Sequence, residues 1–236
     1  MKGRSPHGDY EDLGMRGGWR FTLELVVERE LVLVFFDLYE AAFGSLRTRS
    51  IARQVLTEAE FSEQMTNPAV RKYVAWDAAG DPVGMCVVTT DLTTVPWISP
   101  EYFAARYPEH WERRAIWYIS FLLAHPSQRH SRFLDHIIDV GVGELVEAGA
   151  VCAYDMCSYN AAELGLGRRV SESFQRTTGV APALTDSQTY YTLDVGHHPV
   201  TAPKDPLGTT ERATIHDLAG PIGTADTVGQ GSVGTL

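Results

Sequence analysis

The residues best suited to chemistry surround a short turn in the middle of the chain. An apolar run, Ile116–Ala124, ends in the polar residues 125–129, and a helical pattern opens at Ser131. The first N–H groups of a helix have no internal acceptor, and the helix dipole favours negative charge beside them. A buried strand, a polar turn and a helix N-terminus therefore predict an anion site. Its local positive charge is supplied by Arg129, His130 and Arg132.

A second group of polar side chains accompanies the next apolar run, residues 151–159. Asp155 is a carboxylate in apolar surroundings, which is costly to bury without a partner. It is interpreted either as a base or substrate anchor, or as a paired structural carboxylate. Tyr159, with Ser158 beside it, is the nearest candidate acid. His125 is another candidate base, and the alternative for it is a solvated turn residue.

An aromatic segment, residues 92–114, precedes the central apolar run. It is too aromatic for a disordered linker and long for a connection inside a compact domain. We expect it to fold over the site as an acceptor wall, through Trp97, Tyr102 and Trp111. The alternative is an insertion that only covers the sheet.

Hydrophobic periodicity predicts the elements that position these residues. Helical patterns cover 28–46, 57–65, 101–107, 131–148 and 161–178, and strand patterns cover 20–27, 71–76, 83–90, 116–124, 151–159 and 188–195. Thr57 and Glu60 have capping-box spacing, and a glycine turn joins 71–76 to 83–90 as a hairpin. The expected organisation is a flexible arm over 1–18, one domain over 19–195 and a flexible tail over 196–236.

The order of these elements resembles the GNAT acyltransferase family over about residues 20–195. That family has the run His-Pro-x-x-(Gln/Arg)-x-x-Gly-x-(Gly/Ala) after its fourth strand. His125-Pro126 and Arg129 match it, whereas Arg132 and Leu134 replace the two glycines. The resemblance implies an α/β fold with a mixed, mostly antiparallel sheet, splayed central strands and flanking helices.

The resemblance also implies a thioester co-substrate: acetyl-CoA, a longer acyl-CoA or a phosphopantetheine thioester. In the family, N–H groups at a bulge in the fourth strand often stabilise the oxyanion, and Leu122 to Ala124 are the matching positions. An Asn starts the last helix, and Asn160 matches it, but Gly167 or Arg168 stands where a catalytic Tyr is common. The implied donor-binding residues are Leu122, Leu123, Ala124, Arg129, His130, Ser131, Arg132, Phe133, Leu134 and Asn160.

Three interpretations of this partial match remain open. The chain binds CoA in a modified way, or takes its acyl group from a carrier protein as the related autoinducer and N-acyl amino acid synthases do, or binds without catalysis. The aromatic segment and a basic turn with Arg47, Arg49 and Arg53 fit a carrier protein. The expected function is an N-acyltransferase acting on a small amine, and the alternative is a catalytically silent binding module.

The composition of the chain limits the classes of partner that it is expected to bind. The chain has 236 residues and a formal net charge of −10, which argues against a general nucleic-acid binder. No apolar run reaches the length of a membrane helix, and the start lacks the apolar core of a signal peptide. The low, odd cysteine count suggests reduced thiols in a cytoplasm. No metal is expected, because Asp135, His136 and Asp139 read as a solvated face; a homodimer is one option for the assembly.

Overall fold

The computed structural model describes residues 2–5, 8–128, 132–193 and 196, in which seven strands form one sheet. The strands lie side by side in chain order, and every neighbouring pair is antiparallel except the last, β6 with β7. They are β1 (Lys2–Ser5), β2 (Gly8–Arg16), β3 (Trp19–Glu24), β4 (Val70–Trp76), β5 (Pro82–Thr89), β6 (Ile116–Ala124) and β7 (Val151–Tyr154).

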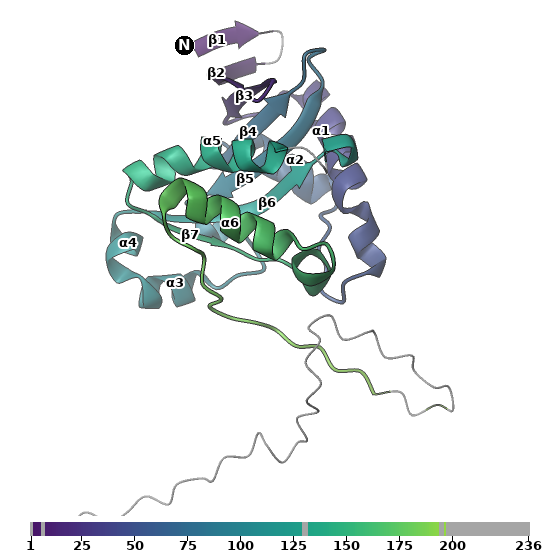
Figure 1. The fold of residues 1–236 in the computed structure, drawn as a ribbon, viewed down its shortest axis with the longest axis vertical. Helices are drawn as coiled ribbons and strands as arrows, with labels where there is room; N and C mark the ends of the chain where they lie inside the picture. The colour runs from purple at the N-terminus through teal and green to yellow at the C-terminus, as the bar shows by residue number, and fades with distance from the viewer. Residues whose placement is uncertain (1, 6–7, 129–131, 194–195, 197–236) are drawn as a thin grey trace, which may run out of the picture. The chain divides into compact units, whose positions relative to one another are not determined.

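Helices cover both faces of this sheet (Figure 1). One face carries α1 and α2, and the other carries α5 and α6, which pack against each other. The α-helices are α1 (Arg29–Phe43), α2 (Glu58–Thr66), α3 (Pro100–Arg106), α4 (Pro108–Glu112), α5 (Phe133–Glu147) and α6 (Leu166–Thr178). None of the described helices is long and apolar enough to cross a membrane.

An aromatic cluster fixes α1 and α2 to the sheet. The Tyr39 ring lies 5.1 Å from the rings of Phe61 and Phe121, which joins both helices to β6. The Tyr39 hydroxyl accepts a 2.9 Å hydrogen bond from the Leu56 amide, so it also holds the connection that precedes α2. Packed aromatic pairs contribute beyond the area they bury, and this cluster therefore holds α1 and α2 against β6.

On the opposite face, Phe133 anchors the start of α5. Its side chain is buried and meets the Trp19 ring edge-on at 5.4 Å between centroids. The close approach depends on Gly84 in β5, because a Cβ built there would lie 2.1 Å from Phe133 Cζ. Gly84 pairs with Ala124, so this contact fixes the helix beside the end of β6.

The strand order and the parallel β6–β7 pair confirm the α/β fold expected from the sequence, with a mixed, mostly antiparallel sheet flanked by helices. The β4–β5 hairpin is confirmed, and the Thr57–Glu60 capping box forms at the start of α2. Residues 101–107 were predicted as a short helix, and α3 occupies Pro100–Arg106.

Three expectations differ from the structure. Residues 188–193 form no strand, so β7 is the edge of the described sheet and the splayed strands are not central; Asp194 and Val195 lie outside the described residues. The predicted N-terminal arm contains β1 and β2 instead. The last helix is interrupted: a π-helical turn, Tyr159–Glu163, comes first, and α6 starts after Gly165 at φ 64°. The predicted tail beyond Gly196 is not described.

A buried polar pair lies between β3 and β4. Glu24 and Lys72 are cross-strand partners and are both almost inaccessible to solvent. The Lys72 Nζ donates to the carbonyls of Leu25 at 2.7 Å and Asn67 at 2.8 Å, whereas Glu24 Oε2 has no hydrogen-bond partner among the described residues. Burial raises the pKa of Glu24 to about 7, and burial also lowers the pKa of Lys72 to about 7.

Alanine at Gly84 tests the anchoring of α5. We expect Gly84→Ala to destabilise the protein by about 1–3 kcal/mol, because the new methyl group must displace the Phe133 ring. Gly143→Ala, in α5 with no atom within 4 Å of the added carbon, is the control. It should stabilise by about 0.5–1 kcal/mol. Chemical denaturation measures both; equal effects would contradict the Phe133 contact.

The Glu24 carboxyl predicts a pH-dependent stability. Its pKa is higher in the folded protein than in the unfolded chain, so the folded state binds more protons between about pH 4.5 and 7. Stability from this group is therefore lost as the pH rises through that window. The free energy of unfolding of Glu24→Gln, relative to that of the wild type, should rise by about 3 kcal/mol between pH 4.5 and pH 7.5. A pH-independent difference in denaturation free energy would contradict the burial of an ionisable Glu24.

Candidate functional site

The strands β6 and β7 part in the middle of β6. Their parallel pairing runs from Ile116 with Val151 to Ile119 with Tyr154 and then stops, although β6 continues to Ala124. A register shift against β5 falls at the same place and leaves Ser120 as the extra residue of a β-bulge. The sequence analysis had matched the bulge to Leu122–Ala124; the structure places it two residues earlier.

Beyond the bulge, β6 presents an unpaired edge. The His125 amide donates to Val83 O at 2.8 Å, so alternate residues of β6 direct their backbone groups toward β5. The amides and carbonyls of Leu122 and Ala124 therefore face away from β5, where no described strand pairs with them. A ligand that offers amide groups in an extended conformation can hydrogen-bond to such an edge.

Asp155 follows β7 directly and lies where the two strands part. Its Oδ1 accepts hydrogen bonds from the Tyr118 hydroxyl at 2.5 Å and from Trp97 Nε1 at 3.1 Å. The side chain is exposed, and no described residue hydrogen-bonds to Oδ2. The carboxylate is thus held in one orientation while one oxygen remains available to a cationic or N–H group.

Tyr118 is the buried member of this trio. Only 2% of it is exposed, and its ring meets Phe103 edge-on at 6.3 Å. Burial raises its pKa, and the negative charge of Asp155 raises it further. The hydroxyl therefore stays protonated over the physiological range and acts as a permanent donor to Asp155.

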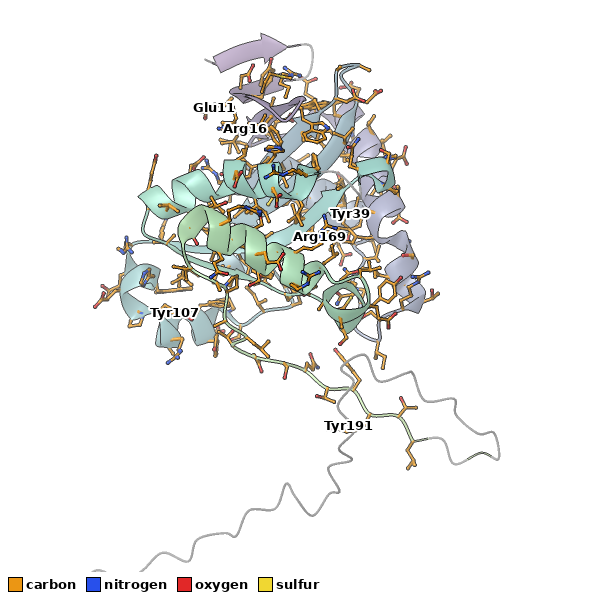
Figure 2. The ribbon with its side chains drawn as sticks, in the orientation of Figure 1. Glu11, Arg16, Tyr39, Tyr107, Arg169 and Tyr191 are labelled. Atoms are coloured by element: carbon orange, nitrogen blue, oxygen red, sulfur yellow. The ribbon has the colours of Figure 1, made fainter. Side chains whose placement is uncertain are left out.

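The aromatic segment 92–114 contributes unequally to this site. It packs over Ile116 and Tyr118 with its apolar residues, which are Leu92, Val95, Ile98, Phe103 and Tyr107. Figure 2 labels Tyr107, which lies between α3 and α4 below the sheet. All three aromatics predicted to line the site are 40–42% exposed, and among them Trp97 is the one with a hydrogen bond to Asp155 in the described residues. The segment is both a structural cover and, through Trp97, part of the site.

The predicted anion turn lies at the far end of β6. His125 begins it, and its Nδ1 accepts from the Ser127 amide at 3.2 Å. Arg132 occupies the N-cap of α5, with its side chain 77% exposed and 3.5 Å from Asp135. Arg176 of α6 also reaches Asp135, at 2.8 Å. Arg129, His130 and Ser131 lie outside the described residues.

Two donor-site residues of the predicted run have structural side chains. Phe133 is buried against Gly84 and Trp19, and Leu134 packs between α5 and α6. The Phe133 side chain is therefore unavailable to a ligand, and the Leu134 side chain is half-buried in the packing of the two helices. Both residues were predicted from the resemblance to the family's glycine-containing run, in which the backbone also contacts the ligand.

Tyr159 and Asn160 lie on the π-helical turn that follows Asp155. The Tyr159 ring packs against the α1–α2 side of the core, and the Arg49 guanidinium lies 4.7 Å above the ring centroid. This contact joins the basic turn after α1 to the segment that carries Asp155. Asn160 is half-buried beside Tyr159, so the structure places both near the same end of β7.

The other two arginines of the basic turn have internal carboxylate partners. Arg47 pairs with Glu40 at 2.6 Å, and Arg53 pairs with Glu60 at 2.6 and 2.7 Å. Between them, residues 50–57 border a surface concavity of about 380 Å³. Arg49 has no carboxylate within salt-bridge distance among the described residues.

The structure brings Asp155, Trp97 and Tyr118 together but separates His125 from them. Ile119, the last residue paired beside Asp155, lies six positions before His125, or about 20 Å along an extended strand. His125 is therefore not a base for the same reaction centre as Asp155. Tyr118 was not among the residues that the sequence predicted for the site. Within the described residues, no group of three or more His, Cys, Asp or Glu could hold a metal ion.

No protein-family model matches the chain, and no curated protein matches it either. Among solved structures, an aminoglycoside acetyltransferase from an uncultured soil metagenomic sample aligns with 11% identity and a TM-score of 0.45, over 75% of this chain and 97% of the other. An aminoglycoside acetyltransferase in complex with coenzyme A and kanamycin aligns with 16% identity and a TM-score of 0.43, over 66% and 98%.

A ribosomal-protein-alanine N-acetyltransferase from Brucella melitensis biovar Abortus 2308 is similar with 12% identity and a TM-score of 0.40, over 75% and 99%. At these identities a similarity concerns the fold alone. The description of the fold rests on the chain's own features, namely the strand order, the bulge at Ser120 and the parting of β6 from β7.

Proposed function

We propose that the protein is an N-acyltransferase that moves an acyl group from a thioester to a small amine. The proposal rests on two kinds of group that lie together where β6 and β7 part. Unpaired backbone groups of Leu122 and Ala124 lie on one side of it, and the oriented carboxylate of Asp155 lies on the other. An amide-containing thioester arm and an amine are the two chemistries that these groups suit.

In the proposed reaction, the acceptor nitrogen attacks the thioester carbonyl, the C–N bond forms and the C–S bond breaks. Asp155 Oδ2 binds the amine and receives the proton that the nitrogen loses. An N–H group of the open β6 edge stabilises the negative charge that develops on the carbonyl oxygen. Tyr159 is the proposed donor of a proton to the leaving thiolate.

Tyr118 and Trp97 are positioning residues in this scheme. Their hydrogen bonds to Oδ1 hold the carboxylate plane, so Oδ2 points toward the acceptor without an entropic cost at the moment of reaction. Tyr102 and Trp111, which are exposed, remain proposed contacts to a larger acceptor or acyl chain.

The thioester donor is proposed to be an acyl-CoA, bound with its phosphates near Arg132 and the start of α5. A carrier-protein donor receives less support, because Arg47 and Arg53 are neutralised by Glu40 and Glu60. The chemistry requires no metal, and a cytoplasmic location, where CoA thioesters are made, belongs to the same proposal.

A catalytically silent binding module is the second candidate. The specific observation in its favour is that Asp135 lies in the first turn of α5, where a phosphate would bind, and occupies both Arg132 and Arg176. An anion must share these arginines with an existing carboxylate. Binding without turnover would identify this alternative.

Native mass spectrometry with acetyl-CoA, a long-chain acyl-CoA and an acyl-carrier protein in turn tests the donor. We expect a one-to-one complex with an acyl-CoA, weakened by about 1–3 kcal/mol in Arg132→Glu, the range for hydrogen bonds to charged groups. Arg168→Glu is the matched control, because both side chains are 77% exposed and Arg168, like Arg132, pairs with a carboxylate of its own helix, Glu172. Equal losses in the two variants would contradict a donor site at the turn.

Turnover tests the acceptor side. With the thiol released from the bound acyl-CoA as the readout and a panel of small amines, Asp155→Asn should reduce kcat/KM by about 10²–10⁴-fold. Trp97→Phe, which removes the N–H donor and keeps a smaller aromatic ring, should reduce it about tenfold. Trp111→Phe should leave it unchanged, since Trp111 does not contact Asp155. Full activity in Asp155→Asn would refute the proposed base.

A further inference from the structure

The turn between α1 and α2 holds one arginine, Arg49, that pairs with no carboxylate among the described residues. The other two arginines of this turn each have such a partner. Arg49 is exposed, and its guanidinium carbon lies 4.7 Å from the centroid of the Tyr159 ring. A guanidinium over an aromatic face keeps its N–H groups free to donate to another acceptor. Arg49 is thus a positioned cation with donors to spare.

Tyr159 connects this cation to the acceptor side of the proposed site. It lies four residues after Asp155, so the two Cα atoms are at most about 14 Å apart. Cys157 and Tyr159 both pack against the core on the side of α1 and α2, so the intervening chain leads from Asp155 toward the turn that carries Arg49. In Figure 1 the coil that precedes α6 lies beside α1.

Two exposed groups of opposite charge therefore lie at the two ends of one short segment. Asp155 offers the oxygen Oδ2, and Arg49 offers its N–H groups. A ligand that carries both an amino group and an anion complements this pair. A carboxylate matches one guanidinium in charge and in planar geometry. A phosphate carries nearly two negative charges at neutral pH, and the second charge would be repelled by Asp155.

We propose that Arg49 selects an amine acceptor that carries a carboxylate, as an amino acid or a short peptide does. The amino group binds Asp155 as in the proposed reaction. The carboxylate, which takes no part in bond making, binds the guanidinium of Arg49. This inference rests on the proposed acyl transfer and specifies the chemical class of its acceptor.

Selectivity between amino acids and their carboxamides tests the role of Arg49, because the amide keeps the size and loses the charge. With the released thiol as the readout, Arg49→Gln should lower the acid-to-amide ratio of kcat/KM about fivefold to tenfold, as expected for an exposed charged pair. Comparing this ratio between variants cancels the different basicity of the two amines. Free amino acids and dipeptides, assayed separately, distinguish the two sources of the carboxylate.

Two further variants separate charge from structure. Arg49→Lys keeps the charge without the planar fork and should retain part of the selectivity. Arg47→Gln is the matched control, because Arg47 lies in the same turn and is paired with Glu40. It should leave the ratio unchanged.

The outcomes distinguish this inference from the proposed function. Acyl transfer with an unchanged ratio in Arg49→Gln, or with an equal fall in Arg47→Gln, overturns the role of Arg49 and leaves the transfer intact. If no amine is acylated, the proposed function fails, and calorimetric binding of the same acids and amides decides the inference. A preference for acids that disappears in Arg49→Gln supports the carboxylate site, and binding without preference, or no binding, overturns it.

Discussion

The ending of the β6–β7 ladder after Ile119 and Tyr154 is the constraint on which the site depends. Backbone N–H and C=O groups must find partners, and a strand that loses its neighbour exposes a row of them. Here that row belongs to Leu122 and Ala124, whose side chains are half-buried against the core beneath α5. The bulge at Ser120 coincides with the loss of pairing and lets β6 continue along β5 while β7 leaves it.

The parting is stable because β6 is held from both faces independently of β7. On one side, Phe121 packs against Tyr39 and Phe61; on the other, Phe133 fills the space above Gly84, next to Ala124. Asp155 is similarly supported by a segment far from it in sequence, since Trp97 and Tyr118 come from the aromatic cover and from β6. The residues that hold β6 and Asp155 in place therefore lie outside the gap between β6 and β7, which stays open.

Local signals explain what the sequence could predict. The Thr57–Glu60 capping box, the β4–β5 hairpin and the turn at His125 each depend on residues within a few positions of one another. Tyr118 and Trp97, which hold Asp155, lie 37 and 58 positions before it in the chain. The sequence around Asp155 contains no local signal that identifies such distant partners. The sequence places Phe133 in a predicted ligand-binding turn, whereas the structure shows that its ring packs over Gly84. Residues 188–193 have strand propensity, but a strand exists only where another edge receives it.

Charge decides how the donor end of the site can work. The first turn of α5 carries Asp135, which opposes a phosphate there, and Arg132 and Arg176 both approach that carboxylate. The net binding energy of a phosphate at the two arginines is their attraction for it minus the cost of weakening their ion pairs with Asp135. The pair with Arg132 is exposed and 3.5 Å long, so it is worth little and is easily exchanged. Arg176, at 2.8 Å, continues to neutralise Asp135 when Arg132 turns to a ligand. The second arginine would therefore leave Arg132 available to a phosphate of the proposed donor.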